Sequence, residues 1–142
     1  MLTEKDKVEQ FKRELKSYEF YKKKVQECNE QLEEIAVKLQ GVSSPAIKDV
    51  IYENAGNPYR KDSRILELMN DEDMLIDERQ RYIDNVLYIE NALLKIPNPN
   101  ERKMIEDVFI RRVRHEKVAM DNGYSSRSGM HKRIDVIIAS II

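Results

Sequence analysis

The last third of the chain gathers short polar and basic side chains on one predicted helix face. Ser126, Arg127 and His131 lie on this face, and Lys132 and Arg133 follow directly. Hydroxyl, guanidinium and imidazole groups hydrogen-bond the edges of nucleotide bases, and an arginine can hold a guanine through two parallel bonds. We therefore expect Ser126, Arg127 and His131 to contact base edges, with Lys132 and Arg133 on the flanking phosphates.

A second basic cluster precedes this face. It comprises Arg111, Arg112, Arg114 and Lys117, which are candidate phosphate contacts that position a protein without reading sequence. Residues 96–142 carry nine Lys or Arg against six Asp or Glu, whereas residues 1–95 carry sixteen against twenty. The overall formal charge of −1 hides this asymmetry, which predicts a polyanionic partner for the basic half. A solvated surface charge remains the alternative for each basic residue.

The elements that must position these side chains are two helices and a tight turn. A short helix begins near His115 or Glu116, and its small Ala119 allows a second helix to cross closely. Gly123 supplies the turn, because glycine tolerates a positive φ, and Tyr124 fills the core beside it. Ser125 or Ser126 can cap the next helix, whose apolar face consists of Met130, Ile134, Ile137 and Ile138. This order is that of a helix-turn-helix, with a helical pair lacking any DNA role as the alternative.

A further helix is predicted in front of this pair. Asn98 can cap it, Pro99 suits its first position, and Glu101 completes a capping-box pattern. Its apolar residues follow at helical spacing up to about Val113 and include Met104, Ile105, Val108 and Phe109. Residues 96–142 are thus predicted to form a three-helix module.

Residues 96–139 resemble the DNA-reading region 4 of bacterial sigma factors. The resemblance runs through Ile96-Pro97, Glu101–Ile105, Val118-Ala119, Gly123–Ser125 and Arg127-Ser128. Small phage regulators of the ArpU/RinA type place such a region after a helical N-terminal half, and this chain is similar to them in length and order. The resemblance implies a DNA-binding regulator of phage or prophage late genes. The chain departs from the pattern at Asn122 and Gly129, where the family has apolar and β-branched residues.

The N-terminal part predicts two long helices. Residues 3–40 form the first, with Thr3 and Asp6 in a capping box and Gly41 at the end. Apolar residues repeat every seven positions in each helix: Phe11, Tyr18, Val25, Leu32 and Leu39, then Leu68, Leu75, Tyr82 and Ile89. The second helix covers residues 62–95, is capped by Asp62 or Ser63, and is joined to the first by a loop at 42–61. We expect a long antiparallel helical hairpin over residues 1–95 that supports a homodimer.

The cysteine, the two histidines and the acidic residues do not form a pattern typical of a metal or catalytic site. Cys28 is the only cysteine, and His115 and His131 lie sixteen residues apart without neighbours at metal-ligand spacing, so no metal site is expected. The acidic residues 71–73, 77 and 78 are typical of a solvated helix face. We expect neither an enzyme, a cofactor, a small-molecule substrate nor a membrane segment.

The sequence therefore favours an all-α, cytoplasmic, DNA-binding transcription regulator in a bacterial host. Its expected partners are double-stranded DNA, a second copy of the chain and host RNA polymerase. Two alternatives stay open: a small DNA-packaging subunit of the terminase type, which would assemble into a larger ring, and a coiled-coil interaction protein without DNA affinity.

Overall fold

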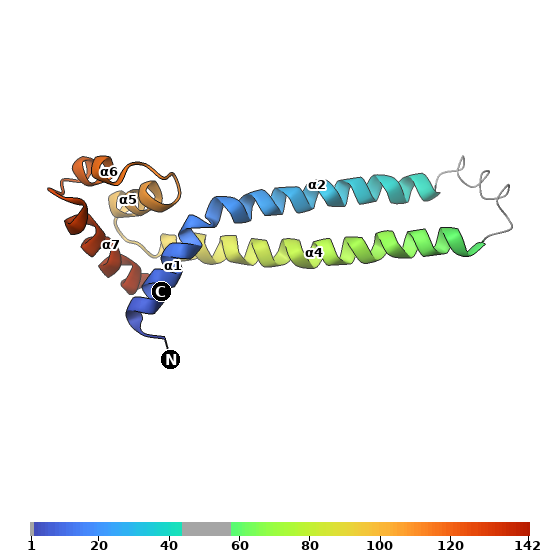
Figure 1. Cartoon of the computed structure of the whole chain (residues 1–142), viewed down its shortest axis with the longest axis horizontal. Coiled ribbons are helices and arrows are strands. Elements are labelled where there is room, and N and C mark those ends of the chain that lie inside the picture. Colours follow the sequence, from blue (N-terminus) through green and yellow to red (C-terminus); the bar gives the residue numbers. More distant parts are fainter. Residues whose placement is uncertain (1, 44–57) are drawn as a thin grey trace. The chain divides into compact units, whose positions relative to one another are not determined.

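Helices account for most of the residues that the structure describes. The structure is a computed structural model that describes residues 2–43 and 58–142, within which there are six α-helices and no strand (Figure 1). The helices are α1 (Glu4–Lys16), α2 (Tyr18–Ser43), α4 (Pro58–Leu94), α5 (Pro99–Phe109), α6 (His115–Asp121) and α7 (Arg127–Ile141). The predicted all-α class is confirmed. None of these helices combines the length and the apolar character needed to cross a bilayer.

Contacts within the chain divide it into two compact units. The first unit combines residues 1–22 with residues 84–142, and the second unit comprises residues 23–83. The first unit is therefore discontinuous in sequence, because it contains both ends of the chain. The boundary predicted between residues 95 and 96 falls inside this first unit.

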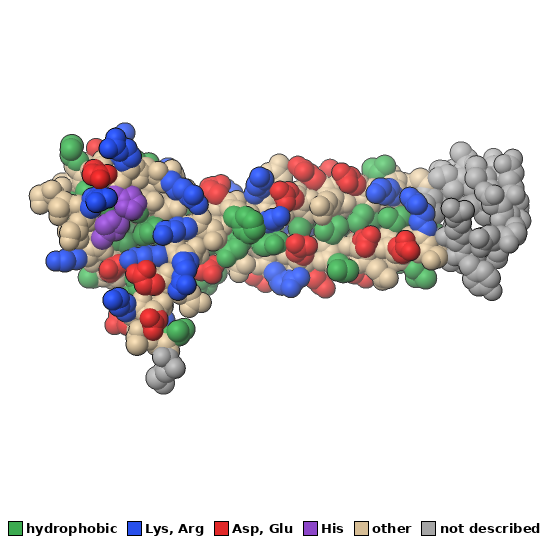
Figure 2. Space-filling view, in the orientation of Figure 1, with side chains coloured by type: hydrophobic (Ala, Val, Ile, Leu, Met, Phe, Trp, Pro, Cys, Tyr) green, Lys and Arg blue, Asp and Glu red, His purple; other side chains and the backbone are tan. Residues whose placement is uncertain are grey.

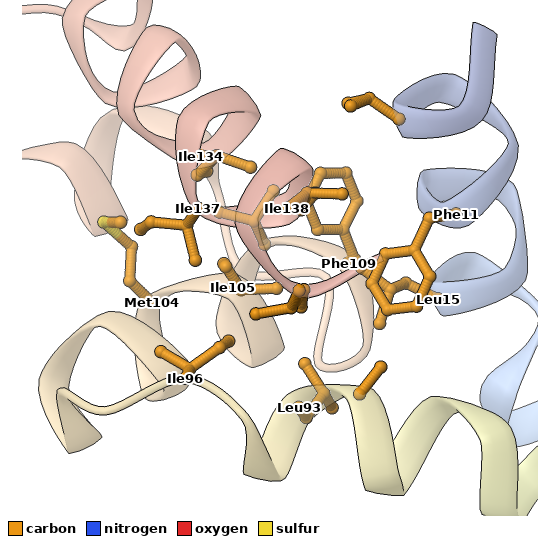
Figure 3. Packing of buried hydrophobic residues seen from close by; sticks show 14 of the residues in the cluster. Phe11, Leu15, Leu93, Ile96, Met104, Ile105, Phe109, Ile134, Ile137 and Ile138 are labelled. Carbon is orange, nitrogen blue, oxygen red and sulfur yellow. The ribbon is translucent and has the colours of Figure 1, made fainter. Parts of the chain in front are cut away.

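The core of the first unit is assembled from both ends of the chain (Figure 3). Phe11 and Leu15 of α1 are 2% and 0% exposed, and α1 contacts α5 and α7. The other large side chains that are fully enclosed there include Ile89, Ile96, Met104, Ile105, Met130, Ile134 and Ile138. Burial of this apolar surface is the main stabilising term for the unit, and α1 supplies part of it.

The prediction of one helix over residues 3–40 is wrong, because the helix is interrupted at Ser17. The Ser17 hydroxyl donates to the Arg13 carbonyl at 3.0 Å, and such back-bonding by serine bends helices. Ser17 forms the C-cap of α1, with φ −92° and ψ −1°. The predicted Thr3–Asp6 capping box is confirmed at the start of α1. Phe11, expected in the hairpin seam, packs in the first unit instead.

The second unit contains the larger part of α2 and the first part of α4, which run side by side in opposite directions (Figure 1). Arg79 Nη1 donates to Asn29 Oδ1 at 2.9 Å across the pair, and Cys28, Ile35 and Leu68 are buried. Gly41 does not end α2, which continues to Ser43, and α4 begins at Pro58 rather than at 62 or 63. Most of the loop predicted at 42–61 lies outside the described residues, and its two ends are helical.

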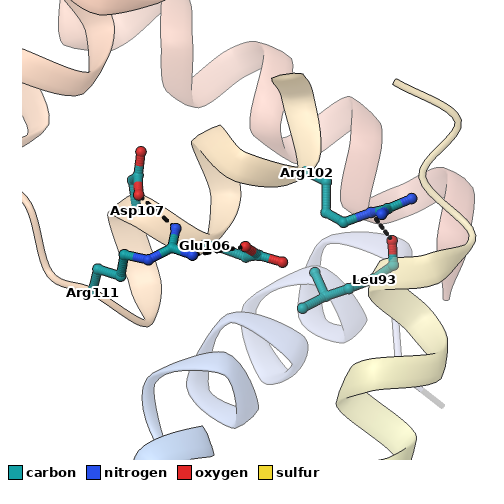
Figure 4. Close-up of polar contacts among 5 residues, drawn as sticks. All are labelled: Leu93, Arg102, Glu106, Asp107 and Arg111. Carbon is teal, nitrogen blue, oxygen red and sulfur yellow. Dashed lines mark hydrogen bonds and ion pairs between the residues drawn. The ribbon is translucent and has the colours of Figure 1, made fainter. Parts of the chain in front are cut away.

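The end of α4 is fastened to α5 by one side chain. Arg102 Nε donates to the Leu93 carbonyl at 3.1 Å (Figure 4). Its Nη2 donates to the Ile96 carbonyl at 3.0 Å. These carbonyls belong to the last turn of α4 and the residues after it, where helical partners run out. The connection therefore fixes the start of α5, whose N-cap is Asn98, as predicted.

Candidate nucleic-acid interface

The turn that joins α6 to α7 is closed by backbone hydrogen bonds. The Tyr124 amide donates to the Ala119 carbonyl at 2.8 Å, and the Gly123 amide donates to the Met120 carbonyl at 3.1 Å. This pair of bonds is a Schellman motif, in which the residue after the C-cap has a positive φ. Gly123 occupies that position with φ +81°, and Ala119 is 2% exposed. The two helices thus meet through a turn with a defined backbone.

The start of α7 is capped and open to solvent. Ser126 is its N-cap, and the hydroxyl oxygen accepts from the Gly129 amide at 3.3 Å. The Arg127 side chain is 60% exposed and lies 3.4 Å from Glu116 on α6. Both partners are exposed, so this ion pair contributes little and is easily exchanged. The pKa of Glu116 is lowered by a hydrogen bond from its own backbone amide and by the charge of Arg127.

His131 lies against α6 rather than standing free. Its Nε2 is 3.1 Å from His115 Nδ1, and both rings are half-buried. Burial lowers the pKa of His131, and the nearby charges of His115, Lys12 and Arg127 lower it further, partly offset by Asp135. The ring therefore stays neutral at neutral pH, with one nitrogen directed at its partner imidazole.

The two cationic residues that follow His131 differ in their surroundings. Arg133 forms a bidentate pair with Glu101 of α5, with Nε–Oε2 at 2.6 Å and Nη2–Oε1 at 3.1 Å. Glu101 is engaged by Arg133 and does not close the predicted capping box with Asn98, whose side chain accepts from the Asn100 amide. Lys132 is exposed and makes no ion pair with the described residues. Lys132 is thus the more accessible of the two cations.

The second basic cluster, Arg111, Arg112, Arg114 and Lys117, also contains both engaged and accessible side chains. Arg111 pairs with Asp107 at 2.7 Å and with Glu106 at 3.3 Å (Figure 4). Arg112 has φ +54° and donates from Nη2 to the last carbonyl of α1, that of Lys16, at 3.3 Å. A positive φ at a residue with a side chain is a strained conformation, and here it reverses the chain between α5 and α6.

Arg114 and Lys117 are exposed and have no ion pair among the described residues. Arg114 is the N-cap residue of α6, although its side chain makes no capping hydrogen bond. Figure 2 shows basic side chains at several points around the two histidines, with acidic side chains among them. Three of the predicted phosphate contacts, Arg114, Lys117 and Lys132, are therefore available, and three are held by the chain itself.

Sequence reasoning missed the residues that hold α7 in place. Lys12 of α1 lies 2.5 Å from Asp135 of α7 and 3.1 Å from Glu9, and its side chain is only 14% exposed. Burial would lower the pKa of Lys12, but hydrogen bonds to Asp135 and Glu9 outweigh it and raise the pKa. No local signal predicts this contact, because it joins residues more than a hundred positions apart.

Comparison of the chain with family models, with curated proteins and with solved structures finds no match. Among the described residues, no group of three or more His, Cys, Asp or Glu side chains is arranged to hold a metal ion. The interpretation of this surface therefore depends on its own geometry.

Proposed function

We propose that the protein is a sequence-specific regulator of transcription that binds double-stranded DNA through the start of α7. One observation carries the proposal: Arg127 is 60% exposed at the capped start of a helix whose opposite face, including Met130 and Ile134, is fully buried. A helix-turn-helix needs such a second helix, anchored on one side and open at its first turn. In this proposal α6 and α7 form that motif.

The side chains at the start of α7 have the chemistry for reading bases. Arg127 can exchange Glu116 for the O6 and N7 atoms of a guanine, which accept two parallel hydrogen bonds. The Ser126 oxygen accepts from the Gly129 amide, and its proton remains available to a base edge or a phosphate. His131 is turned toward His115, so a base contact from its Nε2 requires the ring to leave that partner.

Phosphate binding falls first to Lys132, Arg114 and Lys117, which are exposed. Arg111 sits in an exposed pair that a phosphate can replace at little cost. Arg133 and Arg112 hold Glu101 and the end of α1, so their proposed role shifts toward orienting α7 and the α5–α6 connection.

We further propose that the second unit is an antiparallel helical hairpin that joins two copies of the chain. Its support is an apolar stripe left uncovered on α4, where Leu66, Met69 and Ile76 are 59%, 49% and 40% exposed. These residues are spaced by three and seven positions, the spacing of a helix–helix seam. Each copy would contribute one α7 helix, as in dimeric helix-turn-helix proteins, which read two half-sites about 34 Å apart.

The resemblance to sigma region 4 and to ArpU/RinA regulators suggests the biological setting. On that basis we propose control of phage or prophage late genes, with host RNA polymerase as a partner. A ring of eight or more subunits in sedimentation would favour a packaging subunit instead, and a dimer without DNA affinity would favour a coiled-coil interaction protein.

The test is selection of bound fragments from random DNA, followed by affinity measurement over a salt series. Arg127→Ala is expected to weaken binding to the selected site by about 1–3 kcal/mol and to relax the preference at one base pair. Lys117→Ala should instead weaken binding to all sequences alike and lower the salt slope by about one ion.

Lys38→Ala, an exposed change in the second unit, is the matched charge control and should leave the slope unchanged. If the chain enriches no sequence and its affinity is insensitive to salt, the proposed function is wrong.

A further inference from the structure

The two histidines of the chain are brought together although they lie sixteen residues apart in sequence. His115 is the first residue of α6, and His131 lies in the second turn of α7. Their ring centroids are 4.9 Å apart, and His115 Nδ1 is 3.1 Å from His131 Nε2. The chain contains no other histidine, so any imidazole chemistry of this protein belongs to this pair.

The distance between these nitrogens matches that between two ligands of one transition-metal ion. A metal ion about 2.0–2.1 Å from each imidazole nitrogen, in tetrahedral geometry, separates the two nitrogens by about 3.3 Å. The observed 3.1 Å is within a few tenths of an ångström of that value. The two nitrogens therefore already lie at the separation that one ion requires. To bind it, each ring must turn so that its lone pair points at the ion rather than along the line between the two nitrogens.

We propose that His115 Nδ1 and His131 Nε2 bind one divalent late transition-metal ion, of the class Cu²⁺, Ni²⁺ or Zn²⁺. Neutral imidazole is a preferred ligand for all three ions, and water completes the coordination sphere. Binding requires the Nε2–H tautomer of His115 and the Nδ1–H tautomer of His131. Each ring then offers a lone pair to the metal, and no proton leaves the neutral pair.

Carboxylates offset two of the cations near the pair, because Asp135 and Glu9 pair with Lys12 and Glu116 pairs with Arg127. Arg114 and Lys132, each next to a histidine in sequence, are exposed, so solvent screens their charges. Figure 2 shows both imidazoles at the surface, where a hydrated ion can reach them.

A bound ion would join α6 to α7 through two ligands on different helices. Because the ion binds the folded arrangement, it stabilises the chain in proportion to its concentration. It would also hold His131 in its position against α6.

The experiment is calorimetric titration of the full chain with Ni²⁺ at pH 7.5, on a Cys28→Ser background that removes the only thiol. We expect saturable binding of one ion per chain and a rise in melting temperature. His131→Gln and His115→Gln should each abolish both effects, whereas Asn122→Gln, a change at the opposite end of α6 from His115, should retain them.

Nitrogen-detected NMR of the unsubstituted chain titrated with Zn²⁺ makes the test independent of how the variants fold. Shifts at His115 Nδ1 and His131 Nε2 are expected, while the remaining two ring nitrogens stay protonated. Binding that persists in both glutamine variants, or zinc titration without shifts at these two nitrogens, would overturn the proposal. The readout involves no DNA, so its outcome is independent of the proposed function.

Discussion

Two glycines near the candidate interface differ in whether the backbone requires glycine at their position. Gly123 has φ +81° in the α6–α7 turn, and a Cβ added there would meet nothing within 4 Å. Gly129 lies within α7, and its added Cβ would be 3.8 Å from Ser126 and Tyr124, an ordinary contact. Gly123 is thus required because of its backbone conformation, although there is room for a side chain. Gly129 is required neither by its backbone conformation nor by lack of room.

Substitution of these glycines by alanine should therefore change stability in opposite directions. Gly123→Ala is expected to lower the free energy of unfolding by about 1–2 kcal/mol, because a Cβ disfavours the left-handed region. Gly129→Ala should raise it by roughly 0.5–1 kcal/mol, since alanine restricts the unfolded chain. Urea denaturation of the two variants measures both changes, and a shift of the same sign in both would contradict this account.

The stability of the chain should also fall as the solution is acidified below pH 6.5. The pKa of His131 is lower in the folded protein than its ordinary value, so the unfolded chain binds this proton more tightly. The stabilisation is fully present above pH 6.5 and is lost as the pH falls toward the folded-state pKa.

Denaturation at pH 7.5 and pH 5, in buffer with chelator, should show a larger loss for the unsubstituted chain than for His131→Gln. Equal losses in the two proteins would mean that His131 is not the responsible group. Asp6 and Glu116 also have lowered pKa values, but as carboxyl groups they act at lower pH.

At the scale of elements, long-range polar contacts set how the helices join. Arg102 bonds two carbonyls at the end of α4, Arg133 holds Glu101 of α5, and Lys12 holds Asp135 of α7. Each contact joins two helices, either at a helix end or between partly buried side chains. Tyr18 and Glu90 add a 2.6 Å hydrogen bond between the start of α2 and the end of α4.

Removal of the Arg102 side chain should lower the free energy of unfolding, although the residue is polar and only partly buried. Arg102→Ala leaves the Leu93 and Ile96 carbonyls without this partner, and we expect a loss of about 2 kcal/mol in unfolding free energy. Lys103→Ala, the exposed neighbour, should change stability by less than about 0.5 kcal/mol. Thermal or chemical denaturation gives the free energy of unfolding of both variants. If Arg102→Ala and Lys103→Ala lose similar amounts, Arg102 does not stabilise the junction between α4 and α5.

Elements governed by local chemistry could be predicted from the sequence, and contacts between distant residues could not. The caps at Thr3, Asn98 and Ser126 depend on side chains within three residues of a helix start. The sequence therefore predicts the first two directly and limits the third to Ser125 or Ser126. The helix break at Ser17 was missed, because the heptad repeat continues across it without change. The His115–His131 contact was missed since sequence spacing carries no information about it.

At the scale of the whole molecule, the predicted C-terminal module is part of a larger unit. Heptad periodicity identifies an apolar face but not what covers it, so Phe11 and Leu15 were assigned to a hairpin. In the structure they lie in one core with residues of α5 and α7. The module boundary therefore cannot be predicted from residues 96–142 alone.

A fragment containing only residues 96–142 is expected to be largely unfolded. It lacks Phe11 and Leu15 of α1 and Ile89 of α4, all of which are at most 2% exposed in the full chain. A fragment of this size cannot replace that buried surface. Circular dichroism with thermal melting, beside the full chain, tests this; a cooperative transition with native helix content in the fragment would contradict it.

Because the first unit is discontinuous in sequence, the apolar face of α1 is synthesised well before the helix that covers it. Helix α1 is made before α7, which it contacts, and more than a hundred residues separate the two helices. At about 5–20 residues per second, the apolar stripe of α1 stays uncovered for several seconds. The nascent chain thus carries an exposed apolar segment until α7 has been made, and its yield in the cell should respond to chaperone supply and to the speed of elongation.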